Sequence, residues 1–283
     1  MEAKKKALSM SRVVPAIAMT ILAAAFIWVN PFYLAVAFIA LGIVAQVEMK
    51  TVYERVAAKP YFITYLIPPT LFALWIAYGP FHLTFTIITL CLLAALIGFI
   101  SRKLSRLQTT LLSAVYPGVP MFALAALCVL GTYGGAATKP LVQSSAIFII
   151  GGVAAGDIAA LVIGSKIGKR KLCPAISPGK TVEGLIAQLV ATPLFVCGAW
   201  FATKAWIYPG FPLGDALVIG ILCGPLAVAG DLYASWFKRE AGIKDFGKIL
   251  GGHGGVLDRF DGMSFAALFA VMWFVCWQPF YFS

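Results

Sequence analysis

Nine runs of about 20 apolar residues constrain this chain more than any other feature of its sequence. They lie at approximately residues 13–29, 31–47, 61–78, 81–100, 111–132, 141–163, 181–203, 214–233 and 263–282. A helix of about 20 residues is long enough to cross the ~30 Å hydrocarbon layer of a membrane. Because the runs take up most of the 283 residues, we expect an all-α polytopic integral membrane protein with about nine transmembrane helices.

The basic residues indicate how such a bundle is oriented. If the N-terminus lies inside, all but two of the 22 Lys and Arg residues, Lys139 and Lys204, fall in inner segments. Cytoplasmic loops are enriched in these residues, so we expect a cytoplasmic N-terminus, an outside C-terminus and an active site facing the cytoplasm from the inner membrane. The net charge of +11 is then explained mostly by topology and by attraction to anionic lipid, and nucleic-acid binding is not expected.

The ionisable residues divide the chain into two regions. Residues 1–110 have none deep inside their spans, so we expect a four-span scaffold there, with a charged loop at 48–59 whose residues are spaced for i,i+4 helix pairs. Residues 111–283 are expected to form a five-span catalytic region. Its cytoplasmic loops, at 164–180 and 235–262, hold most of the remaining charges.

The window at residues 235–261 holds nine charged side chains and six glycines between two apolar runs. A helix that begins near Val256 would place Asp258 and Asp261 on one face of its first turn, where two carboxylates repel unless a cation neutralises them. Mg²⁺ prefers such oxygen ligands, and glycines allow backbone N–H groups to approach a phosphate. A loop that is charged only for solubility is the alternative.

Two features inside the apolar runs also bear on function. Asp157 lies within the sixth span, where an acidic residue is costly and usually faces a partner or an aqueous cavity. Small residues recur every four positions beside it, which predicts close helix packing along Gly152, Gly156, Ala160, Gly164 and Gly168. In the fifth span, Pro117 and Pro120 predict a kink that serves either a cavity or only packing.

The loop at residues 164–180 carries five basic residues and leads into the segment Ser-Pro-Gly-Lys-Thr-Val-Glu-Gly. This segment is similar to the end of a nucleotide-binding P-loop, but Pro174 stands where the first Gly of that motif belongs and no soluble strand precedes it. We therefore exclude a Walker A motif. Thr181 is placed to cap the next helix, with Glu183 in its first turn.

Most residues of the 235–261 window match the signature of a known family with its spacing intact. The chain resembles the phosphatidate cytidylyltransferases, also called CDP-diacylglycerol synthases, through Ser235, Phe237, Lys238, Arg239, Lys244, Asp245, Gly247, Leu250, Gly252, His253, Gly254, Gly255, Asp258, Arg259 and Asp261. A second motif of that family is matched by Ser177, Pro178, Lys180, Thr181, Glu183 and Gly184. The chain departs from the family pattern at Gly251 and Gly179, where Pro and Lys are common, and after Asp157, where aromatic residues usually follow.

The resemblance implies an enzyme of phospholipid biosynthesis, a nucleotidyltransferase that converts CTP and membrane phosphatidate to CDP-diacylglycerol and pyrophosphate. Nucleotidyl transfer needs an aligned nucleophile, a divalent metal that bridges phosphate oxygens, and cations that neutralise the departing pyrophosphate. The phosphate of phosphatidate is ionised at neutral pH, so a general base is dispensable. Mg²⁺ is the expected cofactor, with or without a second cation.

The family motifs also imply roles for individual residues. The expected Mg²⁺ ligands are Asp231, Asp258 and Asp261. The expected catalytic set is Asp231, Lys238, Arg239, Lys244, Asp245, His253, Asp258, Arg259 and Asp261. The expected substrate-binding set is Asp157, Ser177, Lys180, Thr181, Glu183, Ser235, Gly254 and Gly255. Asp245 either binds metal or orients its basic neighbours, and His253 either contacts a phosphate or belongs to a structural turn.

Two other functions are compatible with parts of the pattern. One is a different CTP-dependent membrane lipid enzyme, such as a polyprenol or phytol kinase, which would release CDP and leave no cytidine on the lipid. The other is a transporter-like protein without catalysis. Transporters keep ionisable groups near the bilayer midplane and often contain internal repeats, whereas the charges of this chain cluster at one face and no repeat is evident. A homodimer is compatible with any of these functions.

Overall fold

The computed structural model describes residues 31–56, 113–130, 144–206, 211–250 and 254–274. The predicted spans at 13–29, 61–78 and 81–100 lie outside these residues, as does His253. Within the described residues the elements, in chain order, are α2 (Pro31–Val56), η2 (Ala114–Gly118), α6 (Val119–Leu130), η3 (Ile147–Gly151), α8 (Gly152–Ile167), β1 (Lys171–Cys173), β2 (Ser177–Thr181), α9 (Val182–Trp206), α10 (Leu213–Glu240) and α11 (Leu257–Met272).

Four helical segments in the described part of the chain are long and apolar enough to cross a membrane. They are Phe32–Val56, Ser144–Ile167, Val182–Lys204 and Leu213–Glu240. Each overlaps one of the predicted spans, which supports a mostly helical, polytopic membrane protein. The total of nine spans and the sides on which the termini lie stay predictions.

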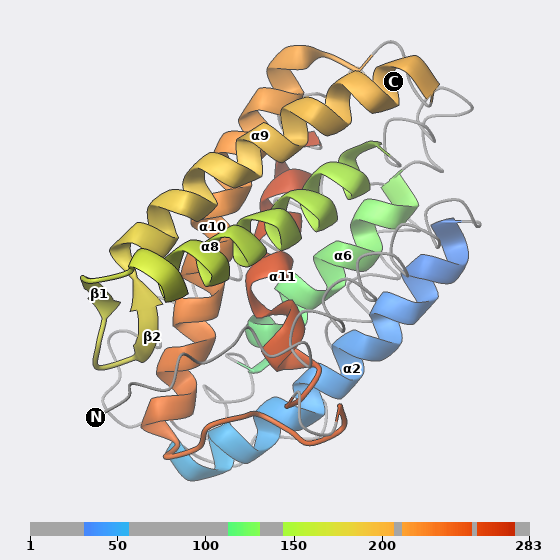
Figure 1. The fold of residues 1–283 in the computed structure, drawn as a ribbon. Helices are drawn as coiled ribbons and strands as arrows, with labels where there is room; N and C mark the ends of the chain where they lie inside the picture. The colour runs from blue at the N-terminus through green and yellow to red at the C-terminus, as the bar shows by residue number, and fades with distance from the viewer. Residues whose placement is uncertain (1–30, 57–112, 131–143, 207–210, 251–253, 275–283) are drawn as a thin grey trace.

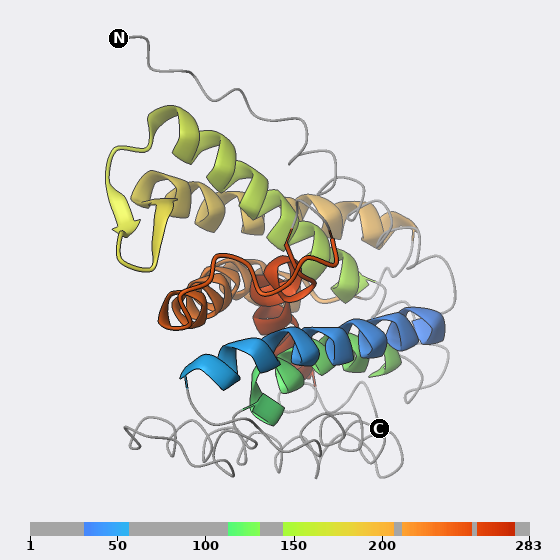
Figure 2. The same cartoon turned by 90° about the horizontal axis from the view of Figure 1, so that it is seen from below.

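The helices form three layers (Figures 1 and 2). Helices α8 and α9 pack together as one layer, α10 and α11 lie in the middle, and α2 packs with α6 on the opposite side. The strands β1 and β2 project beyond one end of α8 and α9, next to α10 (Figure 1). Figure 2 shows the same three layers seen from below.

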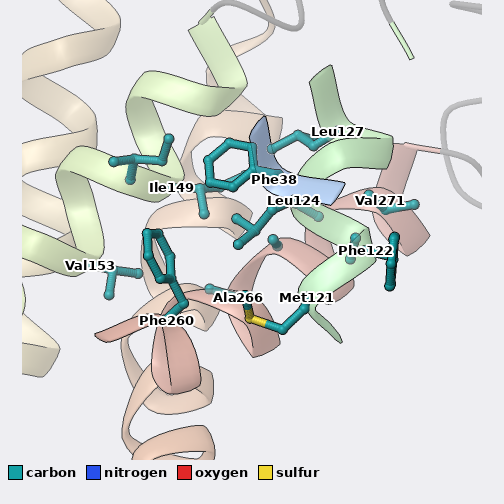
Figure 3. Close-up of a cluster of buried hydrophobic side chains, with 14 of the residues drawn as sticks. Phe38, Met121, Phe122, Leu124, Leu127, Ile149, Val153, Phe260, Ala266 and Val271 are labelled. Atoms are coloured by element: carbon teal, nitrogen blue, oxygen red, sulfur yellow. The ribbon is translucent and has the colours of Figure 1, made fainter. Parts of the chain in front are cut away.

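A hydrophobic core joins the middle layer to its neighbours (Figure 3). Phe38 from α2 meets Phe260 of α11 edge-to-face, with ring centroids 6.1 Å apart. Buried residues of α6 and of the η3–α8 helix, including Leu124 and Ile149, fill the space around this pair. The first turns of α11 are therefore fixed by packing against helices from both halves of the sequence.

The small-residue ridge predicted in the sixth span packs α8 against α9. A Cβ atom added to Gly164 would lie 2.8 Å from Oγ1 of Thr181, and one added to Gly152 would lie 3.0 Å from Val196. A side chain at Gly164 would therefore push against Thr181 at the start of α9, and one at Gly152 would press on Val196 within it. This close contact is what the four-residue spacing predicted.

The structure differs from the prediction in three places. Residues 171–181 contain an antiparallel β-hairpin that pairs Lys171 with Thr181, so part of the loop predicted at 164–180 forms a pair of strands and the fold is not all-α there. Helix α2 continues through the predicted loop at 48–59 as far as Val56, because Val52 and Tyr53 are fully buried and extend its apolar face. Helix α10 likewise continues past the predicted span end at 233 to Glu240, on a buried face formed by Ala234 and Phe237.

Candidate active site

The two stretches that carry the family motifs meet where α10 ends and α11 begins. Helix α11 starts at Leu257 with Val256 as its N-cap residue, as the sequence predicted. The C-terminal turns of α10 lie against both α11 and strand β2. The loop that joins α10 to α11 passes along the C-terminal end of α2 (Figure 1), where the Arg55 guanidinium donates to the Ala241 carbonyl at 3.3 Å.

Asp258 organises the loop between α10 and α11. Its Oδ1 accepts a hydrogen bond from the Lys238 ammonium at 2.8 Å. Its Oδ2 accepts from the backbone N–H groups of Phe246 at 2.8 Å and Gly255 at 2.9 Å. One carboxylate thus ties together the end of α10, the middle of the loop and the start of α11.

Asp261 lies one turn further along α11 and is buried at 8% exposure. Its Oδ1 accepts the backbone N–H of Gly262 at 2.7 Å. The negative charges of Asp231 and Asp157 act on Asp261, and the positive charge of Lys238 opposes them. Close packing holds this turn against α10, since a Cβ atom on Gly262 would lie 2.6 Å from the Ala227 carbonyl oxygen.

Asp231 faces the hairpin from α10. Its Oδ2 lies 2.7 Å from the Lys180 ammonium on β2, and its Oδ1 accepts the Ser235 hydroxyl at 3.2 Å. Both members of the ion pair stay partly accessible, with side-chain exposures of 24% for Lys180 and 40% for Asp231. This pair brings Lys180 of the second motif into direct contact with Asp231, which lies four residues before the first motif begins at Ser235.

Asp157 completes a group of acidic residues on three helices. Its Oδ1 accepts a hydrogen bond from the Gln188 amide of α9 at 2.7 Å, while its side chain remains exposed. The charges of Asp231 and Lys180 both act on it. Carboxylates from α8, α10 and α11 therefore share one electrostatic environment, in which the positive charges of Lys180 and Lys238 oppose them.

The hairpin is anchored to the same region. The Nε of Arg239, near the end of α10, donates to the Ile176 carbonyl at 3.0 Å, next to Ser177. Thr181 caps α9 as predicted, because its Oγ1 accepts the Gly184 backbone N–H at 3.1 Å. The Glu183 carboxylate accepts the backbone N–H of Arg170 at 3.3 Å. Thr181 and Glu183 thus have local structural partners.

Three predicted residues lie further out. Lys244, Asp245 and Arg259 are all exposed. Gly254 adopts a φ of +83°, a left-handed backbone conformation that favours glycine, and its carbonyl accepts the Leu250 N–H at 3.1 Å. Gly254 therefore has a turn-forming role that needs no substrate.

Sequence reasoning missed Glu48. This residue lies on α2, is buried at 6% exposure, and accepts hydrogen bonds from the backbone N–H groups of Val256 at 3.0 Å and Leu257 at 2.9 Å. The only signal in the sequence was an acidic residue directly after an apolar run. The sequence therefore predicts only the start of a charged loop at this position.

The donor atoms at this site suit a hard divalent cation bound together with a ligand. Within the described ranges, no group of three or more His, Cys, Asp and Glu side chains is arranged to hold a metal ion. Mg²⁺ usually needs only one or two carboxylates, with waters and substrate phosphates supplying the remaining oxygens. Asp231 and Asp261 could supply two such carboxylates, although Asp231 already contacts Lys180 and Ser235, and Asp258 already accepts three hydrogen bonds.

Comparisons with known proteins find similarity to cytidylyltransferases. The sequence profile of the Cytidylyltransferase family matches residues 10–277. The chain is 41% identical over 158 residues to a phosphatidate cytidylyltransferase of Helicobacter pylori, covering 56% of this chain and 53% of that protein. Proteins of the same name from Staphylococcus saprophyticus and Brucella suis are 42% identical over 113 residues and 39% identical over 132 residues. These two alignments cover 38% and 46% of this chain, and 40% and 46% of the relatives. The chain thus spans about half the length of the relatives it matches, or somewhat less.

Proposed function

This chain belongs to the cytidylyltransferase family, and we propose that it is a membrane nucleotidyltransferase of phospholipid biosynthesis. Its substrates are CTP and phosphatidate, and its products are CDP-diacylglycerol and pyrophosphate. The observation that carries this proposal is the ion pair between Lys180 and Asp231, because it joins the second family motif to the helix that leads into the first, in a region rich in carboxylates. A lysine beside several carboxylates that can hold a cation suits a nucleoside triphosphate bound through its phosphates.

The proposed reaction balances without a proton acceptor. A phosphate oxygen of phosphatidate attacks the α-phosphorus of CTP and forms a new P–O bond. The bond between the α-phosphorus and the oxygen that bridges it to the β-phosphate breaks, and pyrophosphate leaves with the electron pair. Because the attacking oxygen is already ionised, the side chains only need to align the reactants and neutralise charge.

The basic residues are proposed to hold the phosphates. Lys180 and Lys238 start from ion pairs with Asp231 and Asp258, so each ammonium group is positioned before substrate arrives. The Arg239 guanidinium uses its Nε on the hairpin and keeps further N–H donors for a phosphate. Lys244 and Arg259, which are exposed, are also proposed to contact phosphates of CTP or phosphatidate.

Members of this family typically use a divalent cation, and we propose Mg²⁺ for this chain. Asp231 and Asp261 would hold it. Asp258 remains a proposed ligand that would share its oxygens with the donors it already has. When bound, the ion supplies positive charge to the phosphate oxygens of the nucleotide. A second cation, and a homodimer, remain compatible with this arrangement.

The membrane arrangement is part of the same proposal. Residues 1–110 form a scaffold and residues 111–283 the catalytic region, with the motif loops on the cytoplasmic face of the inner membrane. The excess of basic residues in the proposed inner segments supports this orientation. Phosphatidate would then reach the site from the leaflet that faces the cytoplasm.

Mass spectrometry of the lipid product tests the reaction type. Purified protein is incubated with CTP, phosphatidate and Mg²⁺, and the lipid is extracted. A cytidylyltransferase yields a lipid that has gained a cytidine monophosphate unit, together with pyrophosphate. A lipid that has gained one phosphate group, with release of CDP, would identify a kinase instead. No change in the lipid would contradict the proposed reaction.

A further inference from the structure

Glu48 connects the N-terminal region to the first turn of α11. Its carboxylate accepts hydrogen bonds from two successive backbone N–H groups, Val256 at 3.0 Å and Leu257 at 2.9 Å. These groups have no partner inside the helix, because the first N–H groups of an α-helix point away from it. A carboxylate at this end also interacts favourably with the helix dipole. The contact spans 208 positions in the sequence.

The loop is shaped around this carboxylate. A Cβ atom added to Gly247 would lie 2.8 Å from the Glu48 carboxyl carbon, and one added to Gly255 would lie 2.5 Å from it. Both approaches are closer than real Cβ atoms show, so a side chain at either position would displace the Glu48 carboxylate from its two N–H donors. Two glycines of the family signature therefore make room for a side chain from outside that signature.

Glu48 acts on the same short segment as Asp258. The backbone N–H of Gly255 donates to Asp258, and the N–H groups of the next two residues donate to Glu48. Three successive amides are thus divided between one carboxylate of α11 itself and one carboxylate of α2. The position of Asp258, and of Asp261 one turn later, depends on where this segment is held.

We propose that Glu48 is a positioning residue for the reaction, an inference that rests on the proposed function. It holds the first turn of α11 so that Asp258 and Asp261 keep their places relative to Lys238 and Asp231. Hydrogen bonds to an ionised acceptor are stronger than those between neutral groups. A glutamate whose two oxygens each accept a hydrogen bond from one backbone amide can therefore fix the start of the helix more firmly than a neutral side chain can.

The test compares Glu48→Gln and Glu48→Asp with Glu54→Gln. Glutamine has nearly the same shape but turns its amide NH₂ group, which is a donor, toward one of the two backbone N–H donors. Aspartate keeps the charge but is shorter by one methylene. Glu54 lies on the same helix and pairs with Lys50 at 3.9 Å, so Glu54→Gln is a matched loss of charge away from α11. Turnover is measured per folded molecule, together with the Mg²⁺ concentration that gives half-maximal rate.

We expect Glu48→Gln to lower turnover by about tenfold to a hundredfold, since small displacements of aligned groups have effects of that size. The half-maximal Mg²⁺ concentration should rise several-fold, roughly threefold or more, and Glu48→Asp should recover part of both losses. Glu54→Gln should behave as the parent. Hydrogen exchange at residues 255–257, followed by mass spectrometry, should be about tenfold faster in Glu48→Gln and unchanged in Glu54→Gln.

Two results would overturn the proposal. One is a Glu48→Gln protein that is thermally less stable but has parental turnover and a parental Mg²⁺ requirement per folded molecule, because Glu48 would then serve stability alone. The other is unchanged hydrogen exchange at residues 255–257. If the parent protein itself makes no CDP-lipid, the proposed function fails. In that case, faster exchange in Glu48→Gln alone would still establish that Glu48 anchors α11.

Discussion

The ammonium group of Lys238 lies 2.8 Å from Oδ1 of Asp258, and both side chains are almost fully buried, at 11% and 7% exposure. The two residues are 20 positions apart, one near the end of α10 and the other in the first turn of α11. This ion pair therefore closes the loop that carries most of the family signature. Lys238 and Asp258 have a structural role in addition to the phosphate and metal roles proposed for them.

Asp258→Asn should destabilise the protein. Removing one partner of a buried ion pair leaves the other charge uncompensated, a loss of about 3 kcal/mol or more. The change would also weaken the hydrogen bonds from Phe246 and Gly255. Thermal unfolding in detergent, with and without EDTA, measures the effect. Unchanged stability in EDTA would mean that the pair with Lys238 does not hold the loop together.

Asp261→Asn should behave differently. Asp261 is buried and the charges of Asp231 and Asp157 act on it unfavourably, so the loss of its charge removes repulsion. We expect Asp261→Asn to lose less stability than Asp258→Asn, by roughly 2 kcal/mol or more. Turnover should nevertheless fall by about a hundredfold or more if Asp261 holds the metal. Near-parental turnover in Asp261→Asn would remove it from the proposed set of ligands.

Lys180→Met separates substrate binding from stability. The pair of Lys180 with Asp231 is partly exposed, so its loss should change the free energy of unfolding by less than about 1 kcal/mol. If Lys180 neutralises a phosphate, turnover should fall by about a hundredfold. Lys50→Met is the control, since Lys50 forms a similarly exposed pair with Glu54. Equal turnover in the two variants would argue that Lys180 serves only the hairpin.

Arg239 distinguishes phosphate binding from attraction to the lipid surface. A lysine cannot reproduce both the contact to the Ile176 carbonyl and a forked contact to a phosphate. We expect Arg239→Lys to lose about tenfold in turnover and Arg239→Gln about a hundredfold, at low and high salt alike. Attraction to headgroups contributes only ~1 kcal/mol per residue and is screened by salt.

The control for this comparison is Arg170→Lys. Arg170 is exposed beside the same hairpin. Its hydrogen bond to Glu183 comes from its backbone N–H, which is retained in Arg170→Lys. Rates for all variants are measured in detergent over a range of salt concentrations. If Arg239→Lys and Arg170→Lys both keep full activity, Arg239 does not bind a substrate phosphate.

Several local features of the fold could be predicted from the sequence. The start of α11 near Val256, the capping of α9 by Thr181 and the close packing along Gly164 each depend on neighbours within a few positions or on a regular spacing. Such patterns are visible in one sequence because the residues that satisfy them are close along the chain.

The contacts of Glu48 could not be predicted in this way. Its hydrogen-bond partners lie more than 200 positions away, so no local pattern links them. The hairpin was missed for a different reason. Its strands, of three and five residues, contain lysines, glycine and proline instead of alternating apolar residues, and they are stabilised by contacts with α9 and α10. In both cases tertiary contacts, and not local propensity, determine the structure.

The most direct test of the proposed function follows the two ends of the nucleotide separately. The purified protein is given phosphatidate, Mg²⁺ and CTP that carries one label in the α-phosphate and a different label in the γ-phosphate. We expect the α label in the extracted lipid and the γ label in pyrophosphate, in equal amounts. The γ label in the lipid, or neither label there, would contradict the proposal that this chain is a phosphatidate cytidylyltransferase.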